Sequence, residues 1–492
     1  MKEYISMPHE TIEKNPDNAI NLLREIPGFG ILKGPLLDNN AELLEYEGVK
    51  MVNYDLKLNI PGWPPKDKGD EKKLANYLGL TGDQEVIIPP AWSRGGIIQT
   101  DEGDIVIKGF YINHDFKRKW LDGKYEEFIE ENLKRYDENH FGKLKMTGAL
   151  TEIQRTLNAI KLGYKRPEPI SIFKVIDDRS NAENPNVVYA RLMQNGIRVA
   201  DLMMLKEIGG SEATEKLLDF SIKKLPQEFK VANKDEYINH IIDELTGELT
   251  KRNENKFISL EIGVLQDNFY LNLDPHNISL AGEITDIDHQ ETINEENKHN
   301  PYLRKKQVAQ YASFLGNLIF LADGFDFDKT KVQKTFNIKL LNQPKSYEFF
   351  DLKRTNEIID LLEKSKVVVG FKSSKGYDIE ENGSEIFSES IKQWQDYKDK
   401  LLILEETKKE IELLVDKFQN EIELTSEEKA EETLRGLTKT ELINLSKYFP
   451  EFINEIVELI KNNSQIERRK MIDLLRKNYE KRIYQKIILL DL

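Results

Sequence analysis

Hydrophobic and polar positions recur along the chain with the periods of both strands and helices. Strands are expected where apolar residues alternate with polar ones or form short runs, at 53–60, 103–109, 170–176, 186–192 and 366–371. Helices are expected where apolar residues recur every three or four positions, at 71–79, 147–163, 211–225, 234–252 and 301–322. The apolar segment 257–265 fits either a helix or a strand. From about residue 386 the pattern is strongly helical, with many i,i+4 charge pairs, so we expect an α+β fold with a helical C-terminal region.

One short stretch, residues 272–289, concentrates carboxylate and amide side chains between short apolar runs. Asp274 and Asn277 come first, and Asp286 and Asp288 follow eight or more residues later. A hairpin between the two groups would return Asp286 or Asp288 to the mouth of the first loop. Hard oxygen ligands on adjacent loops are what a magnesium–nucleotide site requires. The simpler alternatives are an Asp-Pro turn at Asp274 and an amide-capped hairpin after it.

Two histidines, His276 and His289, lie beside these carboxylates in the sequence. Histidine and carboxylate together indicate a transition-metal site, but a third histidine does not follow nearby. Histidines in solvated loops are therefore the favoured interpretation.

Charged residues upstream of this stretch complete the pattern of a nucleotide site. Lys108 lies near the end of the strand expected at 103–109, and Glu152 lies in the first part of the helix expected at 147–163. Two further strands follow, so the order is that of a kinase N-lobe. The glycine-containing turn at 92–96 could admit a phosphate, although a plain tight turn and an edge lysine explain the same residues.

Composition narrows the classes of function. The chain has 492 residues, enough for two to four domains or one large decorated domain. Acidic residues exceed basic ones by 86 to 71, which argues against a general nucleic-acid or anionic-membrane binder. The absence of cysteine excludes disulfides, thiolate catalysis and cysteine-ligated metals. Neither a signal peptide nor an apolar run of about 20 residues is visible, so we expect a cytoplasmic protein without a membrane span.

The stretch at 272–289 resembles a motif of the selenoprotein O (YdiU) family, kinase-fold proteins that transfer AMP from ATP to protein hydroxyls. The family motif reads Asn-Thr-Asp-Asn-Met-Ser-Ile-Leu-Gly-Leu-Thr-Ile-Asp-Tyr-Gly. The chain has Asn272-Leu-Asp274, an added Pro275-His276, and then Asn277 through Asp286. Asn277 and Asp286 keep the family's separation of nine positions (286 minus 277).

Shorter motifs that flank this stretch agree with the family in their order. The matches to the family's Leu-Lys-Gly, Arg-Glu-Phe, Thr-Arg-Val and Ile-Arg are Ile107-Lys108-Gly109, Thr151-Glu152-Ile153, Ala190-Arg191-Leu192 and Ile197-Arg198. The resemblance covers roughly residues 70–325. The family's C-terminal cysteine or selenocysteine is absent, so its redox control should not apply.

The resemblance implies a protein-kinase-like two-lobed fold and an ATP- and Mg²⁺-dependent activity. The expected regions are an N-terminal extension, an N-lobe-like nucleotide-binding region, a C-lobe-like catalytic region and a helical region, at 1–85, 86–200, 201–385 and 386–492. Asp274 would accept the proton of a Ser, Thr or Tyr hydroxyl on a protein substrate. The residues implied to bind ATP are Lys108, Glu152, Arg191 and Arg198, and those implied to bind Mg²⁺ are Asn277 and Asp286. For either arginine a surface ion pair is the alternative.

A second alignment makes Asp288 the metal ligand in place of Asp286. The aminoglycoside phosphotransferase-like pattern, His-Gly-Asp-Leu-His-Pro-Gly-Asn, fits Leu273-Asp-Pro-His-Asn277. It places Asn272 near the position of the catalytic aspartate, and asparagine cannot accept the proton. We prefer Asp286 because of its spacing from Asn277. Three functions follow from these alignments: AMP transfer to protein, phosphoryl transfer to a protein or small molecule, and an inactive nucleotide-binding scaffold.

Overall fold

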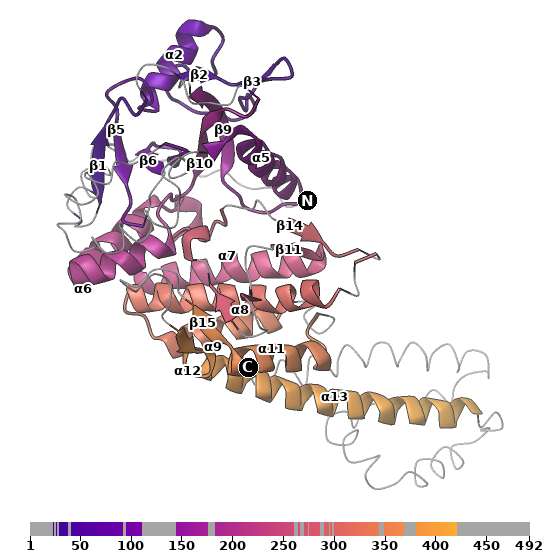
Figure 1. Cartoon of the computed structure of the whole chain (residues 1–492). Helices are drawn as coiled ribbons and strands as arrows, with labels where there is room; N and C mark the ends of the chain where they lie inside the picture. The colour runs from indigo at the N-terminus through magenta and orange to yellow at the C-terminus, as the bar shows by residue number, and fades with distance from the viewer. Residues whose placement is uncertain are drawn as a thin grey trace, which may run out of the picture. The chain divides into compact units, whose positions relative to one another are not determined.

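The computed structural model describes the chain in segments that together span most of residues 23–420. These are residues 23, 26, 29–37, 41–91, 95–110, 144–175, 183–259, 264–265, 270–273, 275–285, 290–294, 296–297, 300–343, 349–368 and 380–420. The chain divides into two compact units, one formed by residues 1–336 and 364–386 and the other by 337–363 and 387–492. The protein is of the α+β type that the sequence predicts (Figure 1).

Within the described residues, the first unit is built on an antiparallel sheet of eight strands. The path through the sheet runs β1 (Gly30–Lys33), β5 (Glu85–Ile88), β6 (Gly95–Gln99), β7 (Asp104–Lys108), β10 (Asn186–Met193), β9 (Glu168–Val175) and β2 (Ala41–Leu43), and β8 (Leu144–Lys145) also pairs with β10. In the register between β7 and β10, Lys108 is opposite Tyr189 and Val106 is opposite Arg191. The sheet thus brings Lys108 and Arg191 onto adjacent strands.

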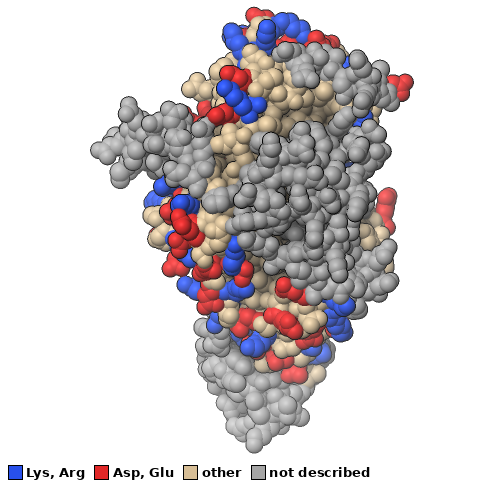
Figure 2. Space-filling model, turned by 60° about the vertical axis from the view of Figure 1, so that its left-hand side comes forward, with Lys and Arg blue, Asp and Glu red and all other residues tan. Residues whose placement is uncertain are grey.

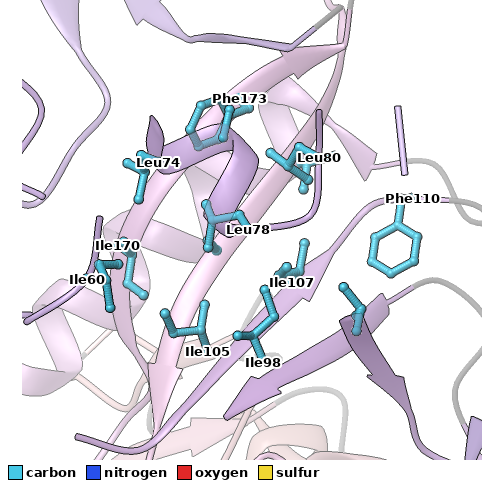
Figure 3. Close-up of a cluster of buried hydrophobic side chains, with 14 of the residues drawn as sticks. Ile60, Leu74, Leu78, Leu80, Ile98, Ile105, Ile107, Phe110, Ile170 and Phe173 are labelled. Carbon is cyan, nitrogen blue, oxygen red and sulfur yellow. The ribbon is translucent and has the colours of Figure 1, made fainter. Parts of the chain in front are cut away.

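Among the described residues, one helix packs on each face of this sheet. On one face, Leu74 and Leu78 of the α2 segment (helix Lys68–Tyr77 and its cap) pack on a cluster that contains Ile107 of β7 and Ala190 of β10 (Figure 3). On the other face, helix α5 (Met146–Lys161) lies beside β9 and β10 (Figure 1) and joins a second cluster that contains Tyr189. Because successive strand residues point to opposite faces, Lys108 and Arg191 belong to the face that α5 covers.

Most elements predicted around Lys108 and Glu152 are confirmed. The predicted strands at 103–109, 170–176 and 186–192 correspond to β7, β9 and β10, and the predicted helices at 71–79 and 147–163 correspond to α2 and α5. Gly79, which was expected to end the first helix, has φ +67°, a conformation that favours glycine.

The strand predicted at 53–60 is wrong, because this segment forms turns. Its alternating apolar residues Leu56 and Leu58 do pack against the sheet cluster, but from an irregular segment. Asn53 N still donates to Ile170 O (2.9 Å), and side chains supply further bonds: Asn53 donates through Nδ2 to the carbonyl of Pro169 (3.0 Å), and Trp63 donates through Nε1 to the carbonyl of Leu56 (2.9 Å). A side-chain pattern of period two therefore did not require a strand at this position.

The remainder of the first unit is largely helical. Its long helices are α6 (Val199–Lys224), α7 (Lys234–Glu254) and α8 (Pro301–Gly324), and these confirm the helices predicted at 211–225, 234–252 and 301–322. The segment 257–265, which fitted helix or strand, contains β11 (Phe257–Ser259) and β12 (Val264–Leu265). The described small elements are η1 (Gln227–Phe229), η2 (Pro275–Asn277), β3 (Glu45–Tyr46), β4 (Val49–Lys50), β13 (Tyr270–Asn272), β14 (Gln290–Thr292), β15 (Lys366–Val368), β16 (Glu380–Asn382) and α12 (Gly383–Ile386).

The second unit is helical in its described part. It contains the end of α9 (Lys329–Leu341), most of α11 (Leu352–Lys364) and α13 (Ser388–Asn420). Trp394 packs edge-on against Phe350 and Tyr397, at ring-centroid distances of 5.2 and 5.5 Å. The helix predicted after residue 386 is confirmed as far as Asn420, and residues 421–492 lie outside the described part of the chain.

The surface carries both signs of charge in close proximity. On the face in Figure 2, Lys and Arg side chains of the described residues lie among Asp and Glu side chains. Many such pairs are local on helices, for example Lys73 with Asp70 and Lys216 with Glu212. None of the helices in the described ranges is long and apolar enough to cross a membrane.

Two glycines offer a test of the sheet packing. An added Cβ at Gly96 in β6 would lie 2.4 Å from Val86 Cγ1, whereas Gly247 in α7 has nothing within 4 Å. We expect Gly96→Ala to lower the free energy of unfolding by about 1–3 kcal/mol through overpacking. Gly247→Ala should raise it by about 0.5–1 kcal/mol, because alanine is the better helix residue. Equal effects of the two substitutions in chemical denaturation would contradict the packing of β5 on β6.

Candidate active site

Three charged side chains meet between the sheet and α5. Lys108 Nζ lies 2.9 Å from Glu152 Oε2, and Arg191 donates through Nη1 to the other carboxylate oxygen, Oε1. The three residues are 6%, 1% and 1% exposed. One carboxylate thus bridges two cations from adjacent strands, and breaking such a buried pair is expensive.

Local sequence explains how this cluster forms. Ala149 and Ile153 pack α5 onto the sheet, and Glu152, beside them on the helix, is buried with them. Lys108 is the last residue of β7, and Gly109 follows it with φ +109°. A Cβ at Gly109 would lie 2.4 Å from the carbonyl oxygen of Val187, so the close approach of β7 to β10 at this end requires glycine.

Asn277, another predicted site residue, precedes a short hairpin, which we define as residues 278–285. Ile278 and Ile284 form a bridge, Ser279 N donates to Glu283 O (2.9 Å), and Thr285 N donates to Asn277 O (2.9 Å). Asp286 follows Thr285 directly in the chain, so the sequence-predicted hairpin forms as far as the residue before it. Asp274, Asp286, Asp288 and His289 lie outside the described residues.

Serine and glycine shape the turn of this hairpin. Ser279 Oγ accepts hydrogen bonds from the backbone N–H groups of Ala281 (3.2 Å) and Glu283 (3.1 Å). Gly282 has φ +77°, which a residue with a Cβ adopts only with strain. Ser279 and Gly282, which lie within the stretch that resembles the family motif, therefore have a structural role in the turn.

The hairpin is tied to α6 and α7. Val199 N donates to Ile278 O (2.9 Å), and Leu280 N donates to Ile197 O (2.8 Å). Tyr237 of α7 donates its hydroxyl to Leu280 O (2.6 Å). Arg198, a predicted ATP-binding residue, thus forms a backbone bridge with Ser279 of the hairpin and is itself 9% exposed.

Helix α8 supports the chain just before Asp274. The carbonyl of Leu273 accepts hydrogen bonds from Ser313 Oγ (3.0 Å) and Asn317 Nδ2 (2.5 Å). A Cβ at Gly316 would lie 2.4 Å from Leu273 Cδ1, so glycine lets the helix come this close. The helix predicted at 301–322 thus packs against this segment of the chain.

The chain between β10 and α6, residues 194–198, which we call the linker, is held by side-chain acceptors. Its five backbone N–H groups all donate to side chains; from Gln194 to Arg198 the acceptors are Glu283, Glu283, Asp104, Asn195 and Asp201. Asp201 also accepts from Ala91 N (2.9 Å), three residues after β5. The sequence interpretation missed these acidic residues. Asp201 is an acidic residue in the first turn of α6, which is a weak local signal, but Glu283 and Asp104 act over long sequence distances.

Glu283 is buried and has a pKa of about 7, well above its ordinary value. Burial is the largest cause and nearby Asp104 adds to it, whereas the N–H groups of Asn195 and Gln194 and the Lys165 ammonium oppose it. Desolvation thus outweighs the two hydrogen bonds that favour the charged form.

A second buried ionic cluster anchors the loop after α5. Arg166 contacts Glu248 of α7 through both terminal nitrogens (3.0 and 2.5 Å), and Arg252 Nε lies 2.7 Å from the same carboxylate. Burial acts to raise the pKa of Glu248, but the two guanidinium groups prevail and lower it to about 2. This cluster ties the loop after α5 to α7.

The structure differs from the sequence at the predicted phosphate-binding turn and describes only part of the predicted metal site. Gly95 and Gly96 lie within β6 rather than in a turn, and residues 92–94 lie outside the described residues. In the described segments, no group of three or more His, Asp or Glu side chains is placed to hold a metal ion. Asn277, a predicted metal ligand, lies at the end of η2 and is half-buried.

Comparison with known proteins does not assign the chain to a class. The sequence matches no protein-family model, and no curated protein matches it significantly.

Removal of the bridging carboxylate provides a test of the charged cluster. We expect Glu152→Ala to lower the free energy of unfolding by about 3–5 kcal/mol, because it leaves two cations buried around the lost carboxylate. Glu212→Ala, which removes an exposed carboxylate 3.1 Å from Lys216, should leave stability close to the wild type. Denaturation midpoints of both variants measure the difference, and similar values would contradict the buried geometry.

The raised pKa of Glu283 predicts a dependence of stability on pH. The folded protein binds this proton more tightly than the unfolded chain, so the contribution is present below about pH 4.5 and is lost as pH rises through about 7. The loss is on the order of 3 kcal/mol. Glu283→Gln should remove it, so the stability of the variant relative to the wild type should rise between pH 5 and 8. A constant difference across that range would show that Glu283 does not titrate as described.

Proposed function

We propose that this chain is a kinase-like nucleotide transferase that transfers AMP from ATP to a hydroxyl side chain of a protein. The observation that carries the proposal is the buried contact between Lys108 of β7 and Glu152 of α5, at 2.9 Å. Kinase-like enzymes pair a strand lysine with a glutamate of the next helix to orient the lysine toward nucleotide phosphates. The chain order β7, α5, β9, β10 supports the same N-lobe-like arrangement.

The residues of the site fit a magnesium–nucleotide ligand. Lys108 and Arg191 supply two positive charges on one face of the sheet. Asn277 supplies an amide oxygen, and Thr285, whose backbone binds Asn277, leads directly into Asp286. Thr285 Oγ1 is buried and has no hydrogen-bond partner among the described residues. Asn277 and Asp286 would hold Mg²⁺, which, when bound, neutralises phosphate charge.

The remaining roles follow from the chemistry of the reaction. The acceptor hydroxyl oxygen bonds to the α-phosphorus as the bond from that phosphorus to the bridging oxygen breaks, and pyrophosphate leaves. Asp274, the neighbour of the Leu273 carbonyl that α8 holds, accepts the hydroxyl proton. Lys108 and Arg191 bind the phosphates and stabilise the negative charge that develops on them. Arg198 completes the set of cations from the end of the linker.

The choice of AMP over phosphoryl transfer rests on the family resemblance, and labelled ATP tests it. The full-length protein is incubated with ATP labelled at the α or the γ position, together with candidate protein acceptors. We expect label on protein from the α position alone. Label from γ alone would establish a phosphotransferase instead, and label from neither, with ATP still bound, would establish an inactive scaffold. Lys108→Ala should abolish α labelling, whereas Lys216→Ala on the exposed side of α6 should not.

Paired aspartate variants in the same assay separate the two alignments. Asp286→Ala should abolish transfer, because it removes a proposed metal ligand, and Asp288→Ala should retain it. The opposite result would favour the aminoglycoside phosphotransferase-like register, with Asp288 as the ligand.

A further inference from the structure

Glu283 connects the hairpin to the linker through a buried carboxylate. Its Oε2 accepts hydrogen bonds from Gln194 N (2.9 Å) and Asn195 N (3.4 Å). Glu283 is 7% exposed. A charged acceptor makes stronger hydrogen bonds than a neutral one, and here they offset part of the cost of burial.

The middle of the linker is held by the strand that carries Lys108. Asp104 of β7 accepts from Gly196 N (2.8 Å) and lies 2.7 Å from Lys224 Nζ at the end of α6. The backbone N–H groups of linker residues 194–196 therefore donate hydrogen bonds to two carboxylates, one from the hairpin and one from β7.

Glu283 is also a short distance along the hairpin from the proposed magnesium ligand. Its own carbonyl accepts from Ser279 N, and two residues later Thr285 N donates to Asn277 O. A shift of Glu283 along the linker would therefore shift the strand that pairs with Asn277. The contacts of Leu280 with Ile197 and Tyr237 do not involve Glu283, so the hairpin should persist without its carboxylate.

We propose that Glu283 is a positioning residue, whose carboxylate sets the distance between the Asn277 side of the site and the Lys108 side by holding the hairpin against linker residues 194–195. This inference rests on the proposed function, because those two sides are the ones proposed to bind magnesium and phosphate. Glu283 acts only through the backbone it holds.

The test compares ATP affinity in the presence of Mg²⁺ with ATP affinity in EDTA, using the full-length protein at pH 8. The ratio of the two dissociation constants measures how well the two sides of the site act together. We expect Glu283→Ala to reduce this ratio by about tenfold, as for other residues that orient metal ligands, with little change in EDTA. Glu283→Gln, which keeps an acceptor oxygen, should retain most of the ratio.

Two outcomes would overturn the inference. An unchanged ratio in Glu283→Ala would show that the carboxylate does not position the site. Equal weakening of both affinities would show a general structural role instead.

Hydrogen exchange of the nucleotide-free protein separates this inference from the proposed function. In Glu283→Ala, the amides of residues 194–195 and 278–285 should exchange faster than in Glu283→Gln, and those of β7 should not. If the wild-type protein binds no ATP, the proposed function fails, and the exchange result still decides whether Glu283 holds the hairpin. Unchanged exchange would sink the inference even if ATP binds as proposed.

Discussion

Five consecutive backbone N–H groups in the linker need acceptors, and the first unit is arranged around supplying them. Buried N–H groups must be paired, and past the end of β10 the linker no longer has a neighbouring strand to pair with. The acceptors come instead from Asp104 of β7, Glu283 of the hairpin, Asp201 of α6 and the linker's own Asn195. One irregular segment thereby fixes the sheet, the first long helix and the hairpin with respect to one another. The cost is three buried carboxylates, of which Asp104 is paired with Lys224.

The charged cluster on the α5 face depends on the same frame. β7 carries both Asp104, which holds the linker, and Lys108, which contacts Glu152; β10 carries Arg191 and continues into the linker. Strand alternation then decides the face: with Ile107 and Ala190 in the core under α2, Lys108 and Arg191 lie on the opposite side. The second anchor, Arg166 on Glu248, ties the loop after α5 to α7. Glu152 is therefore held from the helix and from both strands.

Much of this frame could be predicted from the sequence because its elements have local signals. Hydrophobic period identified β7, α5, β9 and β10, and the family resemblance assigned Lys108 and Glu152, which the structure brings into contact, to one site. The strand prediction at 53–60 failed because apolar residues also alternate in this loop, where side chains such as Asn53 form some of the hydrogen bonds. Glu283 and Asp104 could not be found, because their partners are backbone groups about 90 residues away, which no sequence pattern marks. The hairpin was predictable, but its attachment to the linker was not.

Arg191 has a specific buried partner in the structure, which the sequence did not identify. The family resemblance assigned it to ATP, yet in the folded chain its guanidinium contacts Glu152, the carboxylate that also holds Lys108. Two cations that share one carboxylate are each less than fully neutralised by it, and a phosphate that approaches them meets an arrangement already desolvated and oriented. Under the proposed function, Arg191 would bind phosphate while it keeps its contact with Glu152, because a planar guanidinium carries five donors. In the proposed function, the carboxylate that holds this buried cluster together would also orient both cations toward an anionic ligand.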